Sequence, residues 1–445
     1  MSVSFMLLTS LLLIPSAVLS HDVETLKKEA DALAEKEQFF EAIKLYKECH
    51  ELNPQNIQCI FNAALCLLKI GHIDETIALF ESLVPRVQDA TVIRYNIAYA
   101  HKTAGRLDTA IKLYQDILRG QPGHESTELA LGFAYIQNGD FVHGWEQHSK
   151  YLKRAGKNGD RLRMLLKNNS IAGRRIVLHY EGGLGDTLMF VRYAERLKKL
   201  GAITICMVQE PLIPLLSRCP YIDEVISFSK TMHEYDAYAP LMSMPAIFED
   251  TEITFPVQVP YLYPDEALMQ LWHERLAPLA GIKIGLCWQA DVFNDSSRLP
   301  IARRGIPLNA LEPLLCIPNI TYISLQRYDG TEQIAALPAD CTLITYPDLD
   351  TNHGCFMDTA ALIKNLDCVI AIDSAVAHLA GALGIPTILL LPYNADWRWI
   401  INRTDSPWYP YHTIFKQPAP FDWYSVIEAV RTYLESVYLK KKDFS

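Results

Sequence analysis

The sequence predicts a helical repeat array followed by two α/β domains with a cleft between them. Three observations lead to this fold class. Residues 23–155 repeat a pattern of small, aromatic and glycine residues every 34 positions. A buried strand, a glycine loop and a helical pattern then follow one another from Arg174, which is the start of a βαβ unit. A second series of alternating strands and helices begins at Ile282.

The composition is that of a large folded protein. Half of the 445 residues are hydrophobic and 21% are charged, which favours packed domains over intrinsic disorder. A net charge of −10 argues against nucleic acid as a partner. The ten cysteines form no C-x-x-C pair, so the spacing indicates neither a disulfide scaffold nor a structural zinc site. Such a chain fits a reducing, cytoplasmic compartment.

Residues 1–20 form a separate hydrophobic segment. Its apolar run, residues 5–19, is shorter than the roughly 20 residues that a membrane-spanning helix needs. Small residues at Ser16, Ala17 and Ser20 suit a signal peptide, but no Lys or Arg precedes the run. Export, peripheral membrane association through this segment and a plain hydrophobic helix all stay open as interpretations.

The repeat occupies four windows, which start at Val23, Ile57, Thr91 and Glu125. Small residues recur at Ala30, Ala64, Ala98 and Gly132, and again at Ala42, Thr76, Ala110 and Gly144. Glycines stand at Gly71, Gly105 and Gly139, and aromatic residues at Tyr46, Phe80 and Tyr114. A small residue on each of two helices lets a hairpin pack closely, and the glycine ends the first helix. The pattern resembles the tetratricopeptide repeat and predicts an α-solenoid over residues 23–155.

The fourth window departs from the pattern, because His148 stands at the aromatic position and Trp145 lies nearby. We expect this window to cap the array and to join it to the next domain. A solenoid of this kind can present a peptide or protein on its concave face. The alternative, that the repeats only extend and shield the following domain, stays open.

The rest of the chain predicts two domains, residues 171–265 and 281–445. Their strands are expected to pair in parallel, since helical segments separate them. Pro256, Pro260 and Pro264 mark a linker or hinge between the domains. A last helix, residues 423–439, is expected to pack back across both. The predicted strands are residues 174–180, 203–208, 225–228, 282–288, 320–326, 341–346, 368–372 and 387–391.

Two loops that follow strands carry the candidate chemistry. In the first loop, Gly182, Gly183 and Gly185 allow the backbone to approach a ligand closely. Asp186 follows at the start of a helix, where its carboxylate can cap the helix or act as a general base, and both roles stay open. The loop has the spacing neither of a P-loop nor of the dinucleotide G-x-G-x-x-G motif.

The second loop follows the strand that ends at Ile372. Asp373, Ser374 and Ala375 stand at a helix N-terminus, whose backbone N–H groups suit a diphosphate. His378 lies one turn further on and is expected either to face the ligand or to be a packed core histidine.

Residues 171–425 resemble the heptosyltransferase-like glycosyltransferases of family 9, which have the two-domain GT-B fold. The whole chain resembles bacterial tetratricopeptide proteins that end in such a domain. The matching segments are residues 182–186, 190–194, 285–288, 324–326, 358–361, 373–384, 396–399 and 406–409.

This resemblance implies roles for individual residues. Asp186 becomes the expected catalytic base, on an acceptor-side loop that includes Gly182, Gly183 and Gly185. Arg303 or Arg304 matches a basic position that follows the first strand of the donor domain in the family and suits phosphate charge, and Arg304 is preferred. Residues 289–297 depart from the family's pattern, so the choice between the two arginines stays open. A structural aromatic cluster is the favoured account of the three tryptophans at 397, 399 and 408. The residues expected to hold the donor nucleotide are Asp373, Ser374, Ala375, His378, Leu379, Trp288, Ser324, Gln326 and Arg304.

The implied activity is transfer of a sugar from a nucleotide sugar to a glycan or protein hydroxyl, with no metal and no other cofactor. Helix N–H groups and an arginine would stabilise the leaving diphosphate. The Asp348-Leu349-Asp350 run looks like a metal-binding motif but is discounted. The alternative is a non-catalytic scaffold with a degenerate nucleotide-binding domain. Residues 171–445 hold 22 Lys/Arg against 31 Asp/Glu, a net charge of −9, so local groups must attract an anionic donor.

Overall fold

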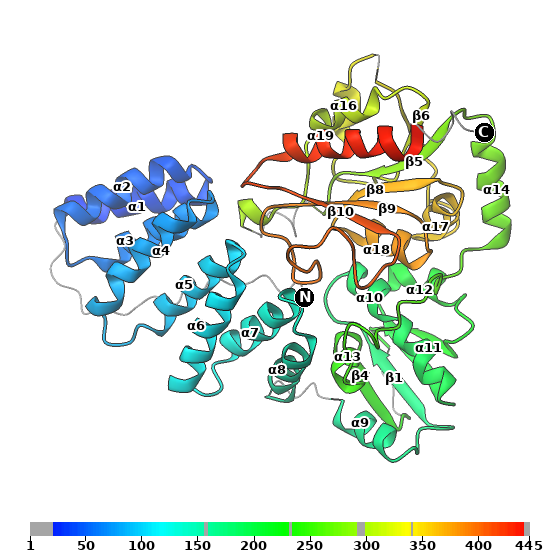
Figure 1. Cartoon of the computed structure of the whole chain (residues 1–445), viewed down its shortest axis with the longest axis horizontal. Helices are drawn as coiled ribbons and strands as arrows, with labels where there is room; N and C mark the ends of the chain where they lie inside the picture. The colour runs from blue at the N-terminus through cyan, green and yellow to red at the C-terminus, as the bar shows by residue number, and fades with distance from the viewer. Residues whose placement is uncertain (1–20, 155–158, 231–233, 292–298, 340, 440–445) are drawn as a thin grey trace.

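The structure, a computed structural model, describes residues 21–154, 159–230, 234–291, 299–339 and 341–439 (Figure 1). It confirms the predicted fold class, since a helical repeat array precedes two α/β domains that are each built on a parallel sheet. The hydrophobic residues 1–20 lie outside the described part of the chain. Within that part, no helix combines the length and the apolar character that crossing a membrane requires.

The array consists of four helical hairpins. Three predicted windows start at the first residue of a helix, at Ile57, Thr91 and Glu125. The repeated small residues, such as Ala64 and Ala110, have no exposed surface, because the helices meet at these points. The hairpins are α1 (His21–Glu35) with α2 (Phe39–Leu52), α3 (Ile57–Lys69) with α4 (Ile73–Leu83), α5 (Thr91–Thr103) with α6 (Leu107–Gly120), and α7 (Glu125–Gln137) with α8 (Phe141–Arg154).

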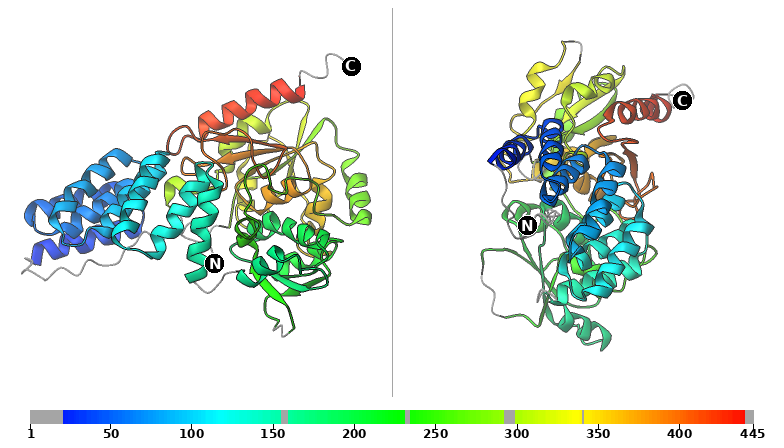
Figure 2. Two further views of the ribbon diagram at one scale, coloured as in Figure 1. Left: turned by 60° about the horizontal axis from the view of Figure 1, so that its bottom comes forward. Right: turned by 90° about the vertical axis from the view of Figure 1, so that its left-hand side faces the viewer.

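The turns within the first three hairpins face the second α/β domain. Glu37, in the first turn, forms an ion pair with Arg303. Gly71 and Gly105 adopt φ values of +85° and +75°, which side-chain-bearing residues rarely do. A Cβ on Gly105 would lie 2.7 Å from the side chain of Ile401, so glycine also permits the close approach. The array therefore runs alongside the second domain (Figures 1 and 2).

The fourth hairpin joins the array to both α/β domains. Phe133 of α7 stacks on Trp397 of the second domain, with ring centroids 4.9 Å apart and planes 6° apart. Phe141 of α8 packs edge-on against Phe255 at 4.8 Å. His148, at the aromatic position of this repeat, is buried against Phe133. The window that departs from the repeat pattern is therefore the one that contacts both α/β domains.

The first α/β domain has a four-stranded parallel sheet in the order β3-β2-β1-β4. The helix predicted after the glycine loop is two helices that meet at Val191. The strands are β1 (Arg175–His179), β2 (Ile203–Val208), β3 (Glu224–Ser227) and β4 (Ala237–Pro240). The helices are α9 (Asp160–Lys167), α10 (Leu184–Phe190), α11 (Arg192–Lys199), α12 (Ile213–Leu216) and α13 (Met244–Ile247).

The second domain has a six-stranded parallel sheet in the order β10-β9-β8-β5-β6-β7. The strands are β5 (Ile282–Cys287), β6 (Ile320–Ser324), β7 (Leu343–Ile344), β8 (Cys368–Ile372), β9 (Thr387–Leu391) and β10 (His412–Lys416). The helices are α14 (Glu266–Leu276), α16 (Glu312–Leu315), α17 (Met357–Ile363), α18 (Ala375–Ala382) and α19 (Trp423–Leu434).

The prediction that the last helix crosses both domains was wrong. The buried residues of α19, among them Val426 and Val430, share a core cluster with Ile284 and Leu286 of β5. All residues of that cluster belong to the second domain. The apolar face of α19 therefore covers one face of the second sheet, and Figure 1 shows the helix beside that sheet.

The proline-rich stretch between the domains is packed rather than loose. Tyr261 is 1% exposed, and its backbone N–H donates to the carbonyl of Ala382 at 3.0 Å. The buried Arg192 donates to the Tyr261 hydroxyl at 2.7 Å and to the carbonyls of Pro256 at 3.1 Å and Trp408 at 2.8 Å. One buried guanidinium thus ties the first domain to the connecting segment and to the second domain.

We predict that His148 makes the junction sensitive to acid. Burial lowers the pKa of His148 to about 4, so the imidazole stays neutral in the folded protein while the unfolded chain binds a proton below about pH 6.5. Its contribution to stability is complete above pH 6.5 and is lost as the pH falls toward 4. His148→Phe should reduce the acid-induced loss in unfolding free energy by up to about 3 kcal/mol, measured by denaturant unfolding from pH 7 to 4. An unchanged pH dependence would contradict this.

Candidate active site

Both sheets reverse their strand order beside the strands that carry the predicted site loops. In the first sheet β2 and β4 flank β1, and in the second sheet β6 and β8 flank β5. Ligands of parallel sheets bind beyond the carboxyl ends of the strands at such points. The glycine loop follows β1, and Asp373 and Ser374 follow β8. The topology therefore puts both loops at the edges where such sheets bind ligands.

The two loops meet because α10 packs on α18. A Cβ on Gly185 would lie 2.7 Å from Cδ2 of His378 and 3.6 Å from Cα of Ala375. Only a residue without a side chain allows this approach at full packing density. The start of α10 in the first domain thus lies against the first turn of α18 in the second.

Asp186 uses its two carboxylate oxygens for two different partners. Oδ2 accepts a hydrogen bond of 2.7 Å from the backbone N–H of Gly183 and so caps α10. Oδ1 forms an ion pair with Arg398 of the second domain. The side chain is 17% exposed. The N-cap residue of α10 is thus Gly183 and not Asp186, but the Asp186 carboxylate satisfies the N-cap N–H and also lies at the boundary between the domains.

Arg398 binds two carboxylates at that boundary, those of Asp186 and Asp396. Its guanidinium also binds Asp396 at 2.6 Å and is 10% exposed. Although burial opposes its charge, Asp186, Asp396 and Asp373 together raise the pKa of Arg398 above its usual value. The backbone is held as well, because the Trp408 indole N–H donates to the Arg398 carbonyl at 2.7 Å. Arg398 is thus a fixed positive charge within the site.

His378 is a packed histidine. A hydrogen bond of 2.9 Å joins its Nδ1 to the Tyr409 hydroxyl, and its ring stacks on Trp399 with centroids 5.5 Å apart. Burial, together with the charge of Arg398, holds the pKa of His378 well below its usual value. Its Nε2 lies 3.8 Å from Oδ1 of Asp373. The imidazole is therefore neutral near pH 7 and keeps its place beside Gly185.

The N-terminus of α18 offers polar groups to a ligand. Ser374 is the N-cap residue, but its hydroxyl makes no capping hydrogen bond. The first backbone bond of the helix runs from His378 N–H to the Ser374 carbonyl at 3.3 Å, so the N–H groups of the preceding turn lie outside the intrahelical pattern. Arg304 donates to the carbonyl of Asp373 at 2.8 Å. Arg303 instead pairs with Glu37 of the array, so Arg304 is the one at this loop.

Four predicted donor residues lie in packed parts of the second domain and of the domain interface. Trp288 and Leu379 have no exposed surface and belong to the cores of the second domain and of the domain interface. The amide of Gln326 is used by the loop after β5, since its oxygen accepts from Gln289 N–H at 2.9 Å and its nitrogen donates to the Gln289 carbonyl at 3.0 Å. Ser324 is 4% exposed and accepts from the backbone of Gln326. The polar side chains of Ser324 and Gln326 therefore support the backbone of neighbouring loops, and the donor role of these four residues stays a prediction.

The aspartates at 348 and 350 have structural partners. Asp348 forms a two-point ion pair with Arg275 at 2.7 and 2.9 Å. Asp350 accepts from the backbone and the hydroxyl of Thr359 at 2.9 and 2.6 Å. Both carboxylates therefore bind side-chain or backbone groups of the second half of the chain.

Sequence reasoning missed Arg398 and Asp396 as site residues. Both lie in the Asp396-Trp397-Arg398-Trp399 segment, where the tryptophans suggested a structural cluster. That cluster exists, since Trp397, Trp399 and Trp408 are all less than 5% exposed. The available signal was the alternation of Asp396 and Arg398 with Trp397 and Trp399, because charged residues among large apolar ones need partners when they are buried.

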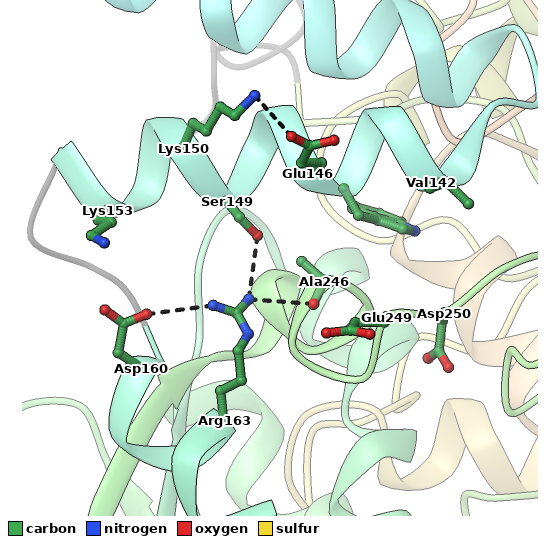
Figure 3. Close-up of a pocket in the computed structure, with 11 residues that line it drawn as sticks. Val142, Glu146, Ser149, Lys150, Lys153, Asp160, Arg163, Ala246, Glu249 and Asp250 are labelled. Atoms are coloured by element: carbon green, nitrogen blue, oxygen red, sulfur yellow. Dashed lines mark hydrogen bonds and ion pairs between the residues drawn. The ribbon is translucent and has the colours of Figure 1, made fainter. Parts of the chain in front are cut away.

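A cavity of about 470 Å³ lies away from these residues, between α8 and the first domain (Figure 3). Most of its charged groups pair with neighbours. Arg163 contacts Asp160 at 3.4 Å and donates to the Ala246 carbonyl at 3.3 Å, and Lys150 pairs with Glu146 at 2.9 Å. The cavity lies where the array meets the first domain, and none of the predicted site residues lines it.

Comparisons with known proteins find similarity in both parts of the chain. A family model described as "Anaphase-promoting complex, cyclosome, subunit 3" matches residues 11–83. Protein FlbA of Caulobacter vibrioides is 26% identical over 418 residues, which cover 87% of this chain and 69% of that protein.

Two solved structures resemble the α/β part. A glycosyl transferase of family 9 from Veillonella parvula covers 61% of this chain and 98% of its own, with 14% identity and a TM-score of 0.44. The ADP-heptose lps heptosyltransferase II of E. coli covers 60% of this chain and 99% of its own, with 15% identity and a TM-score of 0.42.

The chain joins an array of helical hairpins with a 34-residue repeat to two α/β domains that are each built on a parallel sheet. The start of α10, at the end of the glycine loop, packs on α18 and so brings the two domains into contact.

The contact between Gly185 and His378 gives a sharp prediction. Gly185→Ala should lower the unfolding free energy by about 1–3 kcal/mol, because His378 is held by Tyr409 and Trp399 and cannot move aside. Gly183→Ala is the matched control, since its Cβ would lie 3.8 Å from Asp186 and its φ is −86°; it should cost less than about 1 kcal/mol. Denaturant unfolding of both variants measures the difference. Equal effects would show that the two helices do not pack this tightly.

Proposed function

We propose that the protein is a glycosyltransferase that moves a sugar from a nucleotide sugar to a hydroxyl group of a glycan or protein. The observation that carries the proposal is the position of Asp186. Its carboxylate ends the loop after β1 and lies across the domain boundary from the N-terminus of α18. A base on one domain and an anion-binding helix end on the other are the two components that glycosyl transfer needs.

In the proposed reaction, the acceptor oxygen attacks the anomeric carbon of the donor sugar. Asp186 takes the hydroxyl proton as the new C–O bond forms. The bond from the anomeric carbon to the phosphate oxygen breaks, and the electron pair leaves with the nucleoside diphosphate. Oδ2 of Asp186 stays bound to Gly183 N–H during the proton transfer.

The donor diphosphate would sit at the start of α18. The backbone N–H groups and the Ser374 hydroxyl can donate to it, and Arg304 supplies positive charge in an otherwise acidic half of the chain. These groups can stabilise the charge that develops on the leaving diphosphate without a metal ion. Asp373, whose carbonyl accepts from Arg304, would position this loop.

The repeat array would present the acceptor or a partner protein. The fourth hairpin lies directly on both α/β domains, so a chain bound to the array could reach the site between them. A protein or a protein-linked glycan is therefore the acceptor class that this architecture suits best.

Asp186→Asn tests the catalytic role. We expect at least a 100-fold loss of transfer, roughly what loss of a general base costs, while the donor still binds. Release of nucleoside diphosphate from ADP-, GDP- and UDP-linked sugars measures turnover, and Asp348→Asn, which also removes one carboxylate, is the control expected to keep full activity. Full turnover in Asp186→Asn would remove Asp186 from the mechanism.

Thermal unfolding with the same nucleotide sugars identifies the donor. A ligand at 100 times its Kd should stabilise the folded state by about 2.7 kcal/mol and raise the Tm accordingly. Ser374→Ala should weaken this shift, and Ser425→Ala, a serine beside the start of α19, should not. If no nucleotide sugar shifts the Tm or is consumed, the alternative of a non-catalytic scaffold replaces the proposal.

A further inference from the structure

Arg398 is placed to control how Asp186 is oriented. Within the described residues, the Asp186 carboxylate has two restraints, the Gly183 N–H and the Arg398 guanidinium. The backbone hydrogen bond restrains Oδ2 and by itself leaves Oδ1 free to turn. Arg398 fixes it from the other domain, and Asp396 fixes Arg398 in turn at 2.6 Å.

The segment that carries Arg398 is held by an aromatic stack from the repeat array. The Arg398 guanidinium lies 4.3 Å from the ring centroid of Trp397. That ring stacks on Phe133 of α7, with the two planes 6° apart. A guanidinium on a buried aromatic ring is attracted to the face of the ring, so the position of Trp397 sets the position of Arg398.

The array also binds the same segment through its backbone. The N–H of Ile401 donates to the carbonyl of Gln137 at 3.0 Å, and the Gln137 amide donates to the carbonyl of Ala395 at 3.3 Å. The C-terminus of α7 thus holds both ends of residues 395–401. Gly105, in the turn between α5 and α6, packs against Ile401 as well.

A buried amine of the array lies within electrostatic reach of this segment. Burial lowers the pKa of Lys102, on α5, to about 8, while the carboxylate of Asp396 favours its charged form. Asp396 is therefore influenced by cations from both sides, Arg398 in the site and Lys102 in the array. Aromatic, backbone and electrostatic contacts from the array thus all converge on residues 395–401, the segment that carries Arg398.

We propose that Arg398 is a positioning residue for Asp186 and that the repeat array holds Arg398 in place, so that the array and the α/β domains form one catalytic unit. This inference rests on the proposed function, because it assigns Arg398 a role through the proposed base. The array then contributes to turnover even when no partner is bound to it.

The chemistry of arginine makes the role specific. Its planar group donates to Asp186 and Asp396 at once, whereas a lysine amine on a shorter, flexible chain cannot span both with the same geometry. A displacement of about 1 Å at a reacting group can reduce turnover on the order of 100-fold.

The experiment measures kcat and KM in full-length variants, with release of nucleoside diphosphate from whichever ADP-, GDP- or UDP-linked sugar the wild type consumes. Arg398→Gln should lower kcat on the order of 100-fold with a donor KM within about 3-fold, and Arg398→Lys should recover part of that loss. Arg403→Gln is the matched control. Arg403 also bridges the two domains, through Glu252 at 2.5 Å, and it pairs with Asp405 of its own domain at 2.8 Å. These contacts lie outside the site, so the loss of Arg403 should leave kcat unchanged.

The array is tested through Phe133. Phe133→Leu keeps a large apolar side chain but removes the ring stacking, and should lower kcat about 3- to 10-fold. Phe80→Leu, the same change at a buried aromatic position of the second repeat, should not. In the Arg398→Gln background, Phe133→Leu should cause no further loss, because both changes act through the same guanidinium.

Three outcomes would overturn the inference. Unchanged kcat in Arg398→Gln removes the positioning role, and a raised KM with normal kcat makes Arg398 a donor-binding group instead. Fully additive losses for Phe133→Leu and Arg398→Gln would show that the array acts by another route. Thermal unfolding of each single variant, and of the double variant that carries both Asp186→Asn and Arg398→Gln, measures how much the ion pair stabilises the fold in the absence of substrate. If the wild type consumes no donor, the proposed function fails and this role fails with it, whatever coupling the unfolding data show.

Discussion

The packing of α10 on α18 is the contact on which the rest of the molecule depends. At Gly185 the two helices approach so closely that a methyl group would collide with His378. This approach fixes the distance between the carboxyl edges of the two sheets. The cleft predicted between two Rossmann-like domains is therefore closed at one point by a direct helix contact, and the candidate base stands beside it.

Buried arginines make this interface a polar one. Arg192 donates to carbonyls and a tyrosine hydroxyl, and the two terminal nitrogens of Arg398 bind carboxylates. A buried charge is costly unless its hydrogen bonds are made, so each guanidinium specifies one relative placement of the groups around it. The same interactions that join the domains thus also organise the site, and changes at one are expected to be felt at the other.

The repeat array contributes to this organisation through its turns and its last hairpin. Close approaches at Gly71 and Gly105 and the Phe133–Trp397 stack attach it to the second domain along its length. The sequence left two interpretations of the array open. Its contacts with the second domain support the interpretation that the repeats shield that domain, since the array covers and holds one of its segments. Presentation of a partner is compatible with it, because only part of each repeat is used in these contacts.

Local patterns were enough to predict most of the fold. The strands 203–208, 368–372 and 387–391 and three helix starts of the array agree residue by residue with the structure, because hydrophobic runs, glycines and repeated small residues act within a few neighbours. Tertiary structure alone decided that Trp288 and Leu379 are buried, that α19 stays on its own domain, and that Asp186 meets Arg398, 212 residues away. Those outcomes depend on which surfaces meet when segments that are distant in the sequence pack together. Local sequence patterns do not indicate which distant surfaces will meet.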